Sequence, residues 1–219
     1  MTAGADIWAV VPVKDTSDAK QRLGDAVAPA RRRHLALAML EDVLTALAAS
    51  PGLAGLVVVT VDEAAAALAD QYRARVVIEG AREGQTGAVT ATARRLGRDG
   101  SHAILTIPGD VPLVTPDEIA QIIAAHDRNP DFVIVPAHDE RGSNAILCSP
   151  PDAVPLKFGN DSFLPHLAAA RQAGVEPKVL RLPGLGLDID NPADLAAFMK
   201  IPSNTHARAY LEQLHFSHG

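Results

Sequence analysis

Short apolar runs alternate along the chain with longer segments in which apolar positions recur at helical spacing. The short runs are rich in valine and isoleucine, a composition that predicts strands. In chain order, strands are expected at about Ile7–Pro12, Leu56–Thr60, Val76–Ile78, Ala103–Ile107, Phe132–Val135, Ala145–Cys148 and Lys178–Leu182. Most of these runs lack polar residues at alternate positions, so we expect both faces of the sheet to be buried.

The segments between the strands are rich in alanine and leucine and predict helices. They are expected at about Arg31–Ala49, Ala64–Gln71, Gly87–Gly97, Pro116–Asp127, Phe163–Ala173 and Pro192–Met199. Two of them have clear start signals, because Thr115 and Asn191 are N-cap residues followed by a proline, and Glu118 is placed to close a capping box. This alternation predicts an α/β fold with a mostly parallel central sheet flanked by helices.

Length and composition predict one folded domain. The chain has 219 residues, of which 47% are hydrophobic and 21% are charged, as in an ordered globular protein. We expect the domain to span residues 1–201. The segment 202–219 has little apolar periodicity and is expected to form a tail or a short surface helix.

Charge and cysteine content exclude several classes of function. The formal net charge of −6 argues against nucleic acid or an anionic membrane as the main partner. A single cysteine, Cys148, excludes an internal disulfide and a cysteine-rich zinc site. The chain has neither a signal-peptide pattern at its start nor a window of the ~18 apolar residues that a membrane span needs. A cytoplasmic protein is therefore expected.

The end of the first predicted strand carries a group of cations. Ligands of open α/β sheets bind at the carboxyl ends of the strands. Here the strand ends in Pro12-Val13-Lys14, and Lys20 and Arg22 follow before the first helix. These cations are suited to an anionic ligand. The alternative is a solvated basic loop, but Lys14 directly follows a buried strand, where a charge usually has a partner.

A glycine-rich segment follows the third predicted strand. It contains Glu83-Gly84-Gln85-Thr86 and runs into a helix, whose N-terminal N–H groups can bind an anion. Gly80, Gly84 and Gly87 allow the backbone to approach a ligand closely. An ordinary turn would have the same composition.

The fourth strand ends in a carboxylate held between prolines. Asp110 lies within Pro108–Leu113, and near the end of the chain Asp188 and Asp190 fall on the same side of an extended segment. Carboxylates at rigid positions bind hard cations such as Mg²⁺ or Mn²⁺, which complete their shells with water and substrate phosphates. The alternative is that each aspartate is a turn or cap residue.

Two further segments combine small polar residues with glycine. Ser143 and Asn144 precede the sixth predicted strand, and Gly159 and Ser162 precede or begin a helix. Hydroxyl and amide groups beside a helix N-terminus are typical of oxyanion-binding surfaces. Ordinary loops have a similar composition.

Taken in order, these motifs resemble the phospho-acid guanylyltransferases of deazaflavin coenzyme biosynthesis. The resemblance covers about residues 7–200. The matching elements are Pro12-Val13-Lys14 with Ala19-Lys20-Gln21-Arg22-Leu23, Pro108–Leu113, Gly142-Ser143-Asn144-Ala145, Phe158-Gly159-Asn160-Asp161-Ser162, and Asp188–Leu195.

The resemblance implies a single-domain, Rossmann-like nucleotidyltransferase fold of the glycosyltransferase-A type. It also implies condensation of GTP with a phosphorylated three-carbon acid, releasing pyrophosphate. In the implied site Asp110 with Asp188 or Asp190 holds Mg²⁺ or Mn²⁺, and Lys14, Lys20 and Arg22 stabilise the leaving pyrophosphate. Ser143, Asn144, Gly159 and Ser162 match positions that contact the acceptor acid. Nucleotide contacts are implied for Pro12, Val13, Lys14, Glu83, Gly84, Gln85 and Thr86.

One element departs from the family pattern. Where the family usually reads Gly-Leu-Asn-Ala, this chain has Gly84-Gln85-Thr86-Gly87. Because Thr86 has no side-chain amide, either base choice is relaxed or backbone groups make the recognition.

Several alternatives stay open at this point. The acceptor is 2-phospho-L-lactate, phosphoenolpyruvate or 3-phospho-D-glycerate. A same-fold nucleotidyltransferase or glycosyltransferase acting on a sugar phosphate or molybdopterin is a second hypothesis, although its usual Gly-x-Gly-x-x-x-Arg first loop is missing. A non-catalytic nucleotide-binding module is a third. The sequence does not fix the oligomeric state, and a homodimer is compatible with it.

Overall fold

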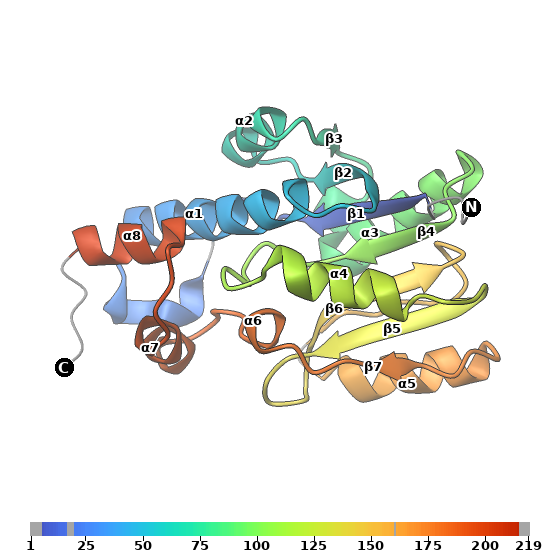
Figure 1. Cartoon of the computed structure of the whole chain (residues 1–219). Coiled ribbons are helices and arrows are strands. Elements are labelled where there is room, and N and C mark those ends of the chain that lie inside the picture. Colours follow the sequence, from blue (N-terminus) through green and yellow to red (C-terminus); the bar gives the residue numbers. More distant parts are fainter. Residues whose placement is uncertain (1–5, 17–19, 160, 215–219) are drawn as a thin grey trace.

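The fold is a seven-stranded sheet with helices on both faces (Figure 1). A computed structural model describes residues 6–16, 20–159 and 161–214. The strands are β1 (Ile7–Pro12), β2 (Leu53–Val59), β3 (Arg75–Val77), β4 (Ala103–Thr106), β5 (Asp131–Pro136), β6 (Ser143–Ser149) and β7 (Lys178–Val179). Each predicted strand is present. The last is shorter than predicted, because the chain after Val179 leaves the sheet.

The helices also follow the predicted order. They are α1 (Pro29–Ala48), α2 (Glu63–Gln71), α3 (Gly84–Arg98), α4 (Pro116–Ala125), α5 (Phe163–Gln172), α6 (Pro183–Gly186), α7 (Pro192–Lys200) and α8 (His206–Gln213), with 3₁₀ segments η2 (Gln21–Ala26) and η3 (Ala81–Glu83). Among the described residues, no helix is long and apolar enough to cross a membrane.

The sheet has the strand order β3-β2-β1-β4-β6-β5-β7. All neighbouring strands are parallel except β6, which is antiparallel to β4 and β5. Val10 of β1 pairs with Val57 of β2 on one side and with Thr106 of β4 on the other. From β1 the chain adds β2 and β3 toward one edge of the sheet. From β4 it adds β5, β6 and β7 toward the other edge. The adjoining ends of β1 and β4 are therefore the point where ligands bind in folds of this kind.

Both faces of the sheet are buried, as the sequence predicts. Ala9 and Val11 of β1 pack into one core with α1, α2 and α4. Val10, which points the other way, packs into a second core with α3 and α5. This alternation explains why the central strands are apolar along most of their length: side chains on both faces have a helical layer to cover them.

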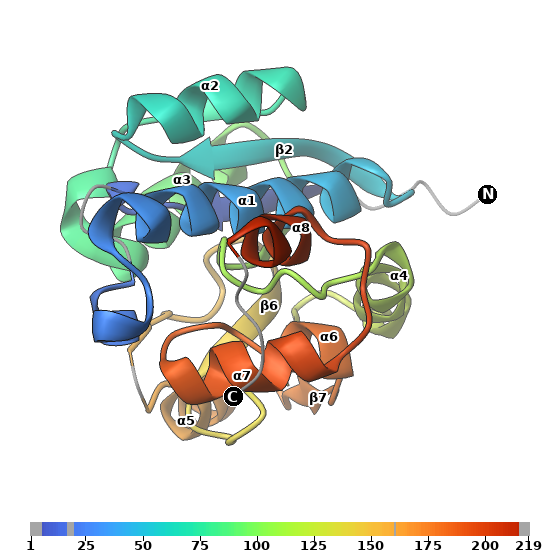
Figure 2. The same ribbon diagram turned by 90° about the vertical axis from the view of Figure 1, so that its left-hand side faces the viewer.

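A third apolar cluster lies beyond the sheet and joins η2, α1, α7 and α8 (Figure 2). Ala207 and Leu211 of α8 are fully buried in it. Asp42 of α1 accepts hydrogen bonds from the backbone N–H groups of His206 and Ala207, at 2.6 and 3.0 Å. Of the two alternatives for the C-terminal segment, the structure forms the short helix and packs it against α1; residues 215–219 lie outside the described residues.

The main hydrogen bonds of the Glu118 carboxylate lie outside the predicted capping box. Thr115 caps α4 by accepting a hydrogen bond from the Glu118 N–H at 3.2 Å, as predicted. The Glu118 carboxylate instead accepts from the N–H groups of Gly184 and Leu185, at 2.7 and 3.0 Å, and so fixes the start of α6. At α7, by contrast, Asn191 and Asp194 form a complete capping box.

Trp8 covers the outer edge of the parallel half of the sheet. Its ring lies directly over Gly55 of β2, where a β-carbon would come within 2.5 Å of the ring. The Arg75 guanidinium of β3 lies over the ring, 4.0 Å from its centroid. This cation–π contact ties β1 to the edge strand β3.

We predict that Asp42→Ala destabilises the protein by about 1–2 kcal/mol, the usual cost of losing a helix-capping acceptor. The substitution leaves two N–H groups of α8 without their acceptor. Chemical denaturation followed by circular dichroism measures the change, with Asp70→Ala, an exposed carboxylate on α2, as the control.

The loss should depend on pH in a defined direction. Burial raises the pKa of Asp42 to about 6, above the value of about 3.9 expected in the unfolded chain. A raised folded-state pKa contributes stability at low pH that is lost as the pH rises through about 6. Asp42→Ala should therefore cost more at pH 5 than at pH 8, and the reverse order would contradict this assignment.

Candidate active site

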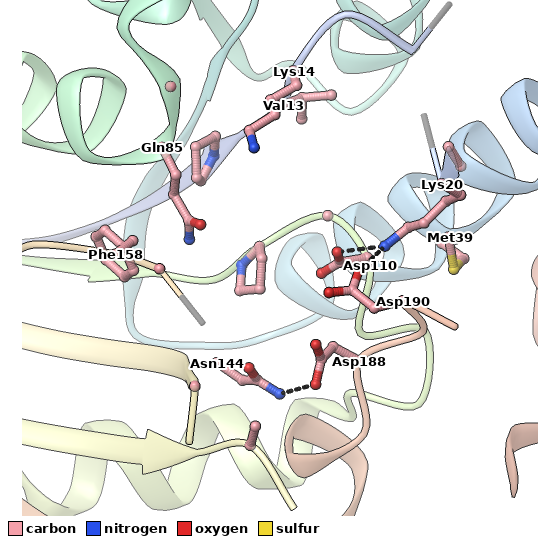
Figure 3. Close-up of a pocket in the computed structure, with 18 of the residues that line it drawn as sticks. Val13, Lys14, Lys20, Met39, Gln85, Asp110, Asn144, Phe158, Asp188 and Asp190 are labelled. Carbon is pink, nitrogen blue, oxygen red and sulfur yellow. Dashed lines mark hydrogen bonds and ion pairs between the residues drawn. The ribbon is translucent and has the colours of Figure 1, made fainter. Parts of the chain in front are cut away.

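A cleft of about 870 Å³ opens at the adjoining ends of β1 and β4 (Figure 3). This is enough space for a nucleotide-sized ligand. Most of the residues predicted for the site line it: Pro12, Val13, Lys14, Lys20, Arg22, Gly84, Gln85, Asp110, Ser143, Asn144, Gly159, Ser162, Asp188 and Asp190. Glu83 and Thr86 are outside this lining.

The ammonium group of Lys20 lies between two carboxylates. Its Nζ is 2.7 Å from Asp110 Oδ2 and 2.8 Å from Asp190 Oδ1, and its side chain is only 10% exposed (Figure 3). Burial alone lowers the pKa of Lys20, but the two carboxylates outweigh it and hold the pKa above its usual value. The sequence predicts an anionic ligand for Lys20; within the protein its partners are these two carboxylates.

Backbone hydrogen bonds fix the two carboxylate segments together. The N–H of Ile189 donates to the carbonyl of Asp110 at 3.1 Å, which joins the end of β4 to the segment before α7. The Asp194 carboxylate accepts from the N–H groups of Asp190 and Asn191, at 2.9 and 3.0 Å. Asp194, which closes the capping box of α7, therefore also orients the backbone at Asp190.

Asp188 has a different partner. Its Oδ1 accepts a hydrogen bond from the Asn144 amide at 3.0 Å, and that amide also donates to the carbonyl of Leu185 at 2.9 Å. Burial, together with the nearby charges of Asp110 and Asp190, raises the pKa of Asp188. Lys20, by contrast, outweighs burial at Asp190 and lowers its pKa. Negative charge is thus in excess at the Asp188 end of the cluster.

This excess of carboxylate charge fits a hard divalent cation. Within the described residues, no group of three carboxylate, imidazole or thiol side chains is arranged to hold a metal ion. Mg²⁺ does not need three, because it binds through one or two carboxylates and completes its shell with water and phosphate oxygens. Two carboxylates drawn from Asp110, Asp188 and Asp190 would be enough for such a set, and a cation bound by Asp110 or Asp190 would compete with Lys20.

The remaining cations lie at the mouth of the cleft. Lys14 is exposed at the end of β1, and Arg22 is 63% exposed, with its Nη1 4.0 Å from Asp190 Oδ2. At that separation the pair is loose, and exposed pairs of this kind contribute little to stability. Both groups are therefore accessible to an anionic ligand.

Sequence reasoning missed the contact that holds the loop after β1. Asp62 Oδ2 accepts from both the N–H and the hydroxyl of Thr16, at 2.9 and 2.6 Å. Asp62 Oδ1 accepts from the N–H of Ala65 and so caps α2. The Asp62-Glu63 pair before an alanine run signals the cap in the sequence, but nothing there signals Thr16 as a second partner.

The glycine-rich segment differs from its prediction in two ways. The helix begins at Gly84, so Gln85 and Thr86 lie in its first turn and not in a loop before it. Gly80 and Gly87 pack against each other, since a β-carbon on Gly80 would come within 2.6 Å of the Gly87 carbonyl oxygen. Only Gly84, with φ of +73° and open space at its β-carbon position, allows the backbone approach that the sequence suggests for all three.

The hydroxyl of Thr86 has a partner within the protein. It accepts a hydrogen bond from the N–H of Phe158 at 3.0 Å. This bond ties the start of α3 to the loop before α5, across the two halves of the sheet. The departure from the family pattern at this position therefore has a structural role in this chain.

Ser143 and Ser162 face one another on the opposite side of the cleft. Both are buried, and the Ser162 hydroxyl donates to Ser143 Oγ at 3.2 Å. Arg141 and Asp161 join the same two segments at the surface through an ion pair of 2.7 Å. The segments that the sequence assigns to an acceptor are thus brought together.

The arrangement is suited to charge neutralisation and alignment. Its cations and carboxylates surround one cleft, which is what phosphoryl or nucleotidyl transfer requires of a protein. Cys148 is fully buried, and burial raises the pKa of its thiol to about 11, so it is no nucleophile at neutral pH.

Comparisons with known proteins agree with this geometry. A family model described as guanylyl transferase CofC like matches residues 7–218. Phosphoenolpyruvate guanylyltransferase of Conexibacter woesei is 36% identical, covering 94% of this chain and 96% of the relative. 3-Phospho-D-glycerate guanylyltransferase of Colwellia psychrerythraea is 34% identical over 85% of this chain and 88% of its own. The solved 4-diphosphocytidyl-2C-methyl-D-erythritol synthase of Anaerococcus prevotii has a TM-score of 0.63 at 14% identity, covering 95% of this chain and 97% of that one. This likeness confirms the nucleotidyltransferase fold.

We predict that Thr86→Val weakens the link between α3 and the loop before α5. Valine keeps the shape of threonine but cannot accept the Phe158 N–H. Loss of a hydrogen bond of this kind costs about 1 kcal/mol, so hydrogen exchange at the Phe158 amide should become roughly fivefold faster. Thr90→Val, further along α3, is the matched control; unchanged exchange at Phe158 in Thr86→Val would mean that the bond does not hold the loop.

Proposed function

The chain belongs to the family of CofC-like guanylyl transferases, and we propose that it transfers the guanylyl group of GTP to the phosphate of a small three-carbon acid. The observation that carries the proposal is the cluster of Asp110, Asp188 and Asp190 facing Lys14 and Arg22 across one cleft. Such a site can hold a triphosphate and a second anion side by side.

The proposed acceptor is phosphoenolpyruvate, 3-phospho-D-glycerate or 2-phospho-L-lactate. The first two are the acceptors named for the relatives. An oxygen of the acceptor phosphate bonds to the α-phosphorus of GTP as the bond to the bridging oxygen breaks, and the electron pair leaves with pyrophosphate. A phosphate monoester has a second pKa near 6, so it is mostly a dianion at neutral pH and needs no general base.

The chain's own residues bind and align the two substrates. Lys14 and Arg22 neutralise the phosphates of GTP, and the N-terminus of α3 at Gly84 and Gln85 lies against the nucleotide. The acceptor lies against the opposite wall, at Ser143 and Ser162. This division follows the two halves of the sheet, because β1 and α3 belong to its parallel part and β6 is its antiparallel strand.

Mg²⁺ or Mn²⁺ is the proposed cofactor. Asp110 with Asp188 or Asp190 would hold it, and its role would be to neutralise phosphate charge during transfer. Lys20 keeps Asp110 and Asp190 in place through its two ion pairs.

The direct test is pyrophosphate release from the protein incubated with each nucleoside triphosphate, Mg²⁺ and each of the three acids. We expect release with GTP and at least one acid. Absence of release with every pair would reject catalysis, and release with a different nucleotide would reject the choice of GTP.

We predict that Asp110→Asn lowers kcat about 10²–10³-fold, the typical cost of removing one electrostatic group from a transition state. The change keeps the shape of the side chain but removes a charge shared by Lys20 and the proposed cation. Steady-state kinetics at saturating Mg²⁺ measure it, with the exposed Asp152→Asn as the control. A near-normal kcat would make Asp110 a turn residue only.

We also predict that Lys14→Met raises the KM for GTP and lowers kcat together. Its charge faces phosphates in the ground state and, as pyrophosphate leaves, in the transition state. Kinetics of Lys14→Met against Lys200→Met, an exposed lysine on α7, separate this effect from a general loss of positive charge. A rise in KM with unchanged kcat would limit Lys14 to docking the nucleotide.

A further inference from the structure

We propose that His166 is a positioning residue that commits the Ser143 hydroxyl to donate a hydrogen bond into the cleft, toward an oxygen of the acceptor acid. The inference rests on the proposed function for the identity of that acid. The orientation of the Ser143 hydroxyl does not depend on the proposed function, because it follows from hydrogen bonds within the protein.

His166 lies on α5, behind the acceptor side of the cleft, and is only 1% exposed. Its Nδ1 is 2.9 Å from Ser143 Oγ, and its Nε2 accepts a hydrogen bond from the backbone N–H of Lys157 at 2.9 Å. The ring of Phe158 packs edge-on against it, with 5.1 Å between the centroids. One imidazole thus joins the start of β6, the loop before α5 and α5 itself.

These partners determine the tautomer of the imidazole. A backbone N–H can only donate, so Nε2 of His166 has to accept and carries no proton. Burial lowers the pKa of His166 to about 4, so the ring is neutral at pH 7. A neutral ring then has its proton on Nδ1, and Nδ1 donates to Ser143.

The tautomer in turn determines what Ser143 can do. Its oxygen accepts from His166 Nδ1 and from the Ser162 hydroxyl, so both of its acceptor positions are used. The hydroxyl proton of Ser143 remains to be donated, and among the described residues it has no acceptor. Ser143 lines the cleft. The hydroxyl therefore points its one remaining group, a donor, toward the ligand.

Asn144 cannot take over this task with its amide nitrogen. Both of its amide protons are engaged, by the carbonyl of Leu185 and by Asp188. Of these two neighbouring side chains, only Ser143 has a donor free for a carboxylate or phosphate oxygen. A ligand without an oxygen there would leave the donor buried and unpaired, which costs affinity.

Two substitutions separate the functions of the two ring nitrogens. The side-chain nitrogen of His166→Asn falls near the position of Nδ1 and keeps a donor for Ser143. His166→Gln places its terminal amide near Nε2, keeping an acceptor for Lys157 but losing the donor. Isothermal titration with phosphoenolpyruvate and with 3-phospho-D-glycerate measures acid binding without turnover, and circular dichroism checks that each variant is folded.

We expect the acid Kd to rise about tenfold in His166→Gln and less than about threefold in His166→Asn, while the Kd for GTP stays within about twofold in both. In a Ser143→Ala background, His166→Gln should have less than about a twofold further effect, because the group it acts through is gone. Equal losses in the two His166 variants, or the same loss with and without Ser143, would show a structural role only and overturn the proposal.

Further measurements distinguish failure of the positioning role from failure of the proposed function. Imidazole ¹⁵N shifts of the wild-type protein should place the proton on Nδ1; a proton on Nε2 overturns the proposal even if a His166 variant fails to fold. Pyrophosphate release by the wild type with unchanged acid binding in His166→Gln would overturn the positioning role alone. Acid binding that follows the expected pattern without pyrophosphate release would reject catalysis and support the positioning role. If neither acid binds the wild type, both fail.

Discussion

Three carboxylates, those of Asp110, Asp188 and Asp190, share one end of the cleft, and like charges this close repel one another. The protein offsets the repulsion with one buried ammonium group. Lys20 reaches two of the three, and it does so from a left-handed backbone conformation, with φ of +54°, that a lysine rarely adopts. Asp188 has the Asn144 amide as its partner, and burial together with the charges of Asp110 and Asp190 raises its pKa. The site is thus built around a charge imbalance that a cationic ligand would relieve.

Holding such a cluster requires rigid backbone on every side of it. The Ile189 N–H donates to the Asp110 carbonyl, and the Asp194 carboxylate accepts from the N–H groups of Asp190 and Asn191. Further away, Glu118 anchors α6, from which the segment carrying Asp188 continues. In the contacts of Asp194 and Glu118, carboxylates outside the cluster accept from backbone N–H groups, so they set the direction of the chain without using the charges of Asp110, Asp188 and Asp190.

The sequence predicted the strands, the longer helices and most of the cleft residues because their signals are local; it gave no signal for α6. Apolar periodicity reveals each strand, and a carboxylate such as Asp110 at a buried strand end is visible without a structure. Contacts between residues far apart in the sequence are not visible without a structure. Lys20 binds Asp190, which is 170 residues away. Glu118 accepts from N–H groups of α6, and Thr86 accepts from the Phe158 N–H. His166 looks like an ordinary helix residue, and only the fold shows that Ser143 lies beside it.

The chain has one tryptophan, and its position on Gly55 beneath Arg75 gives the protein a local optical label. Indole emission depends on the polarity and charge next to the ring. It therefore reports on the contact between β1 and the edge strand β3. A rearrangement confined to the β6 side, away from the contacts with Gly55 and Arg75, is expected to leave this emission unchanged. A shift in emission thus identifies events in the parallel half of the sheet without any introduced fluorophore.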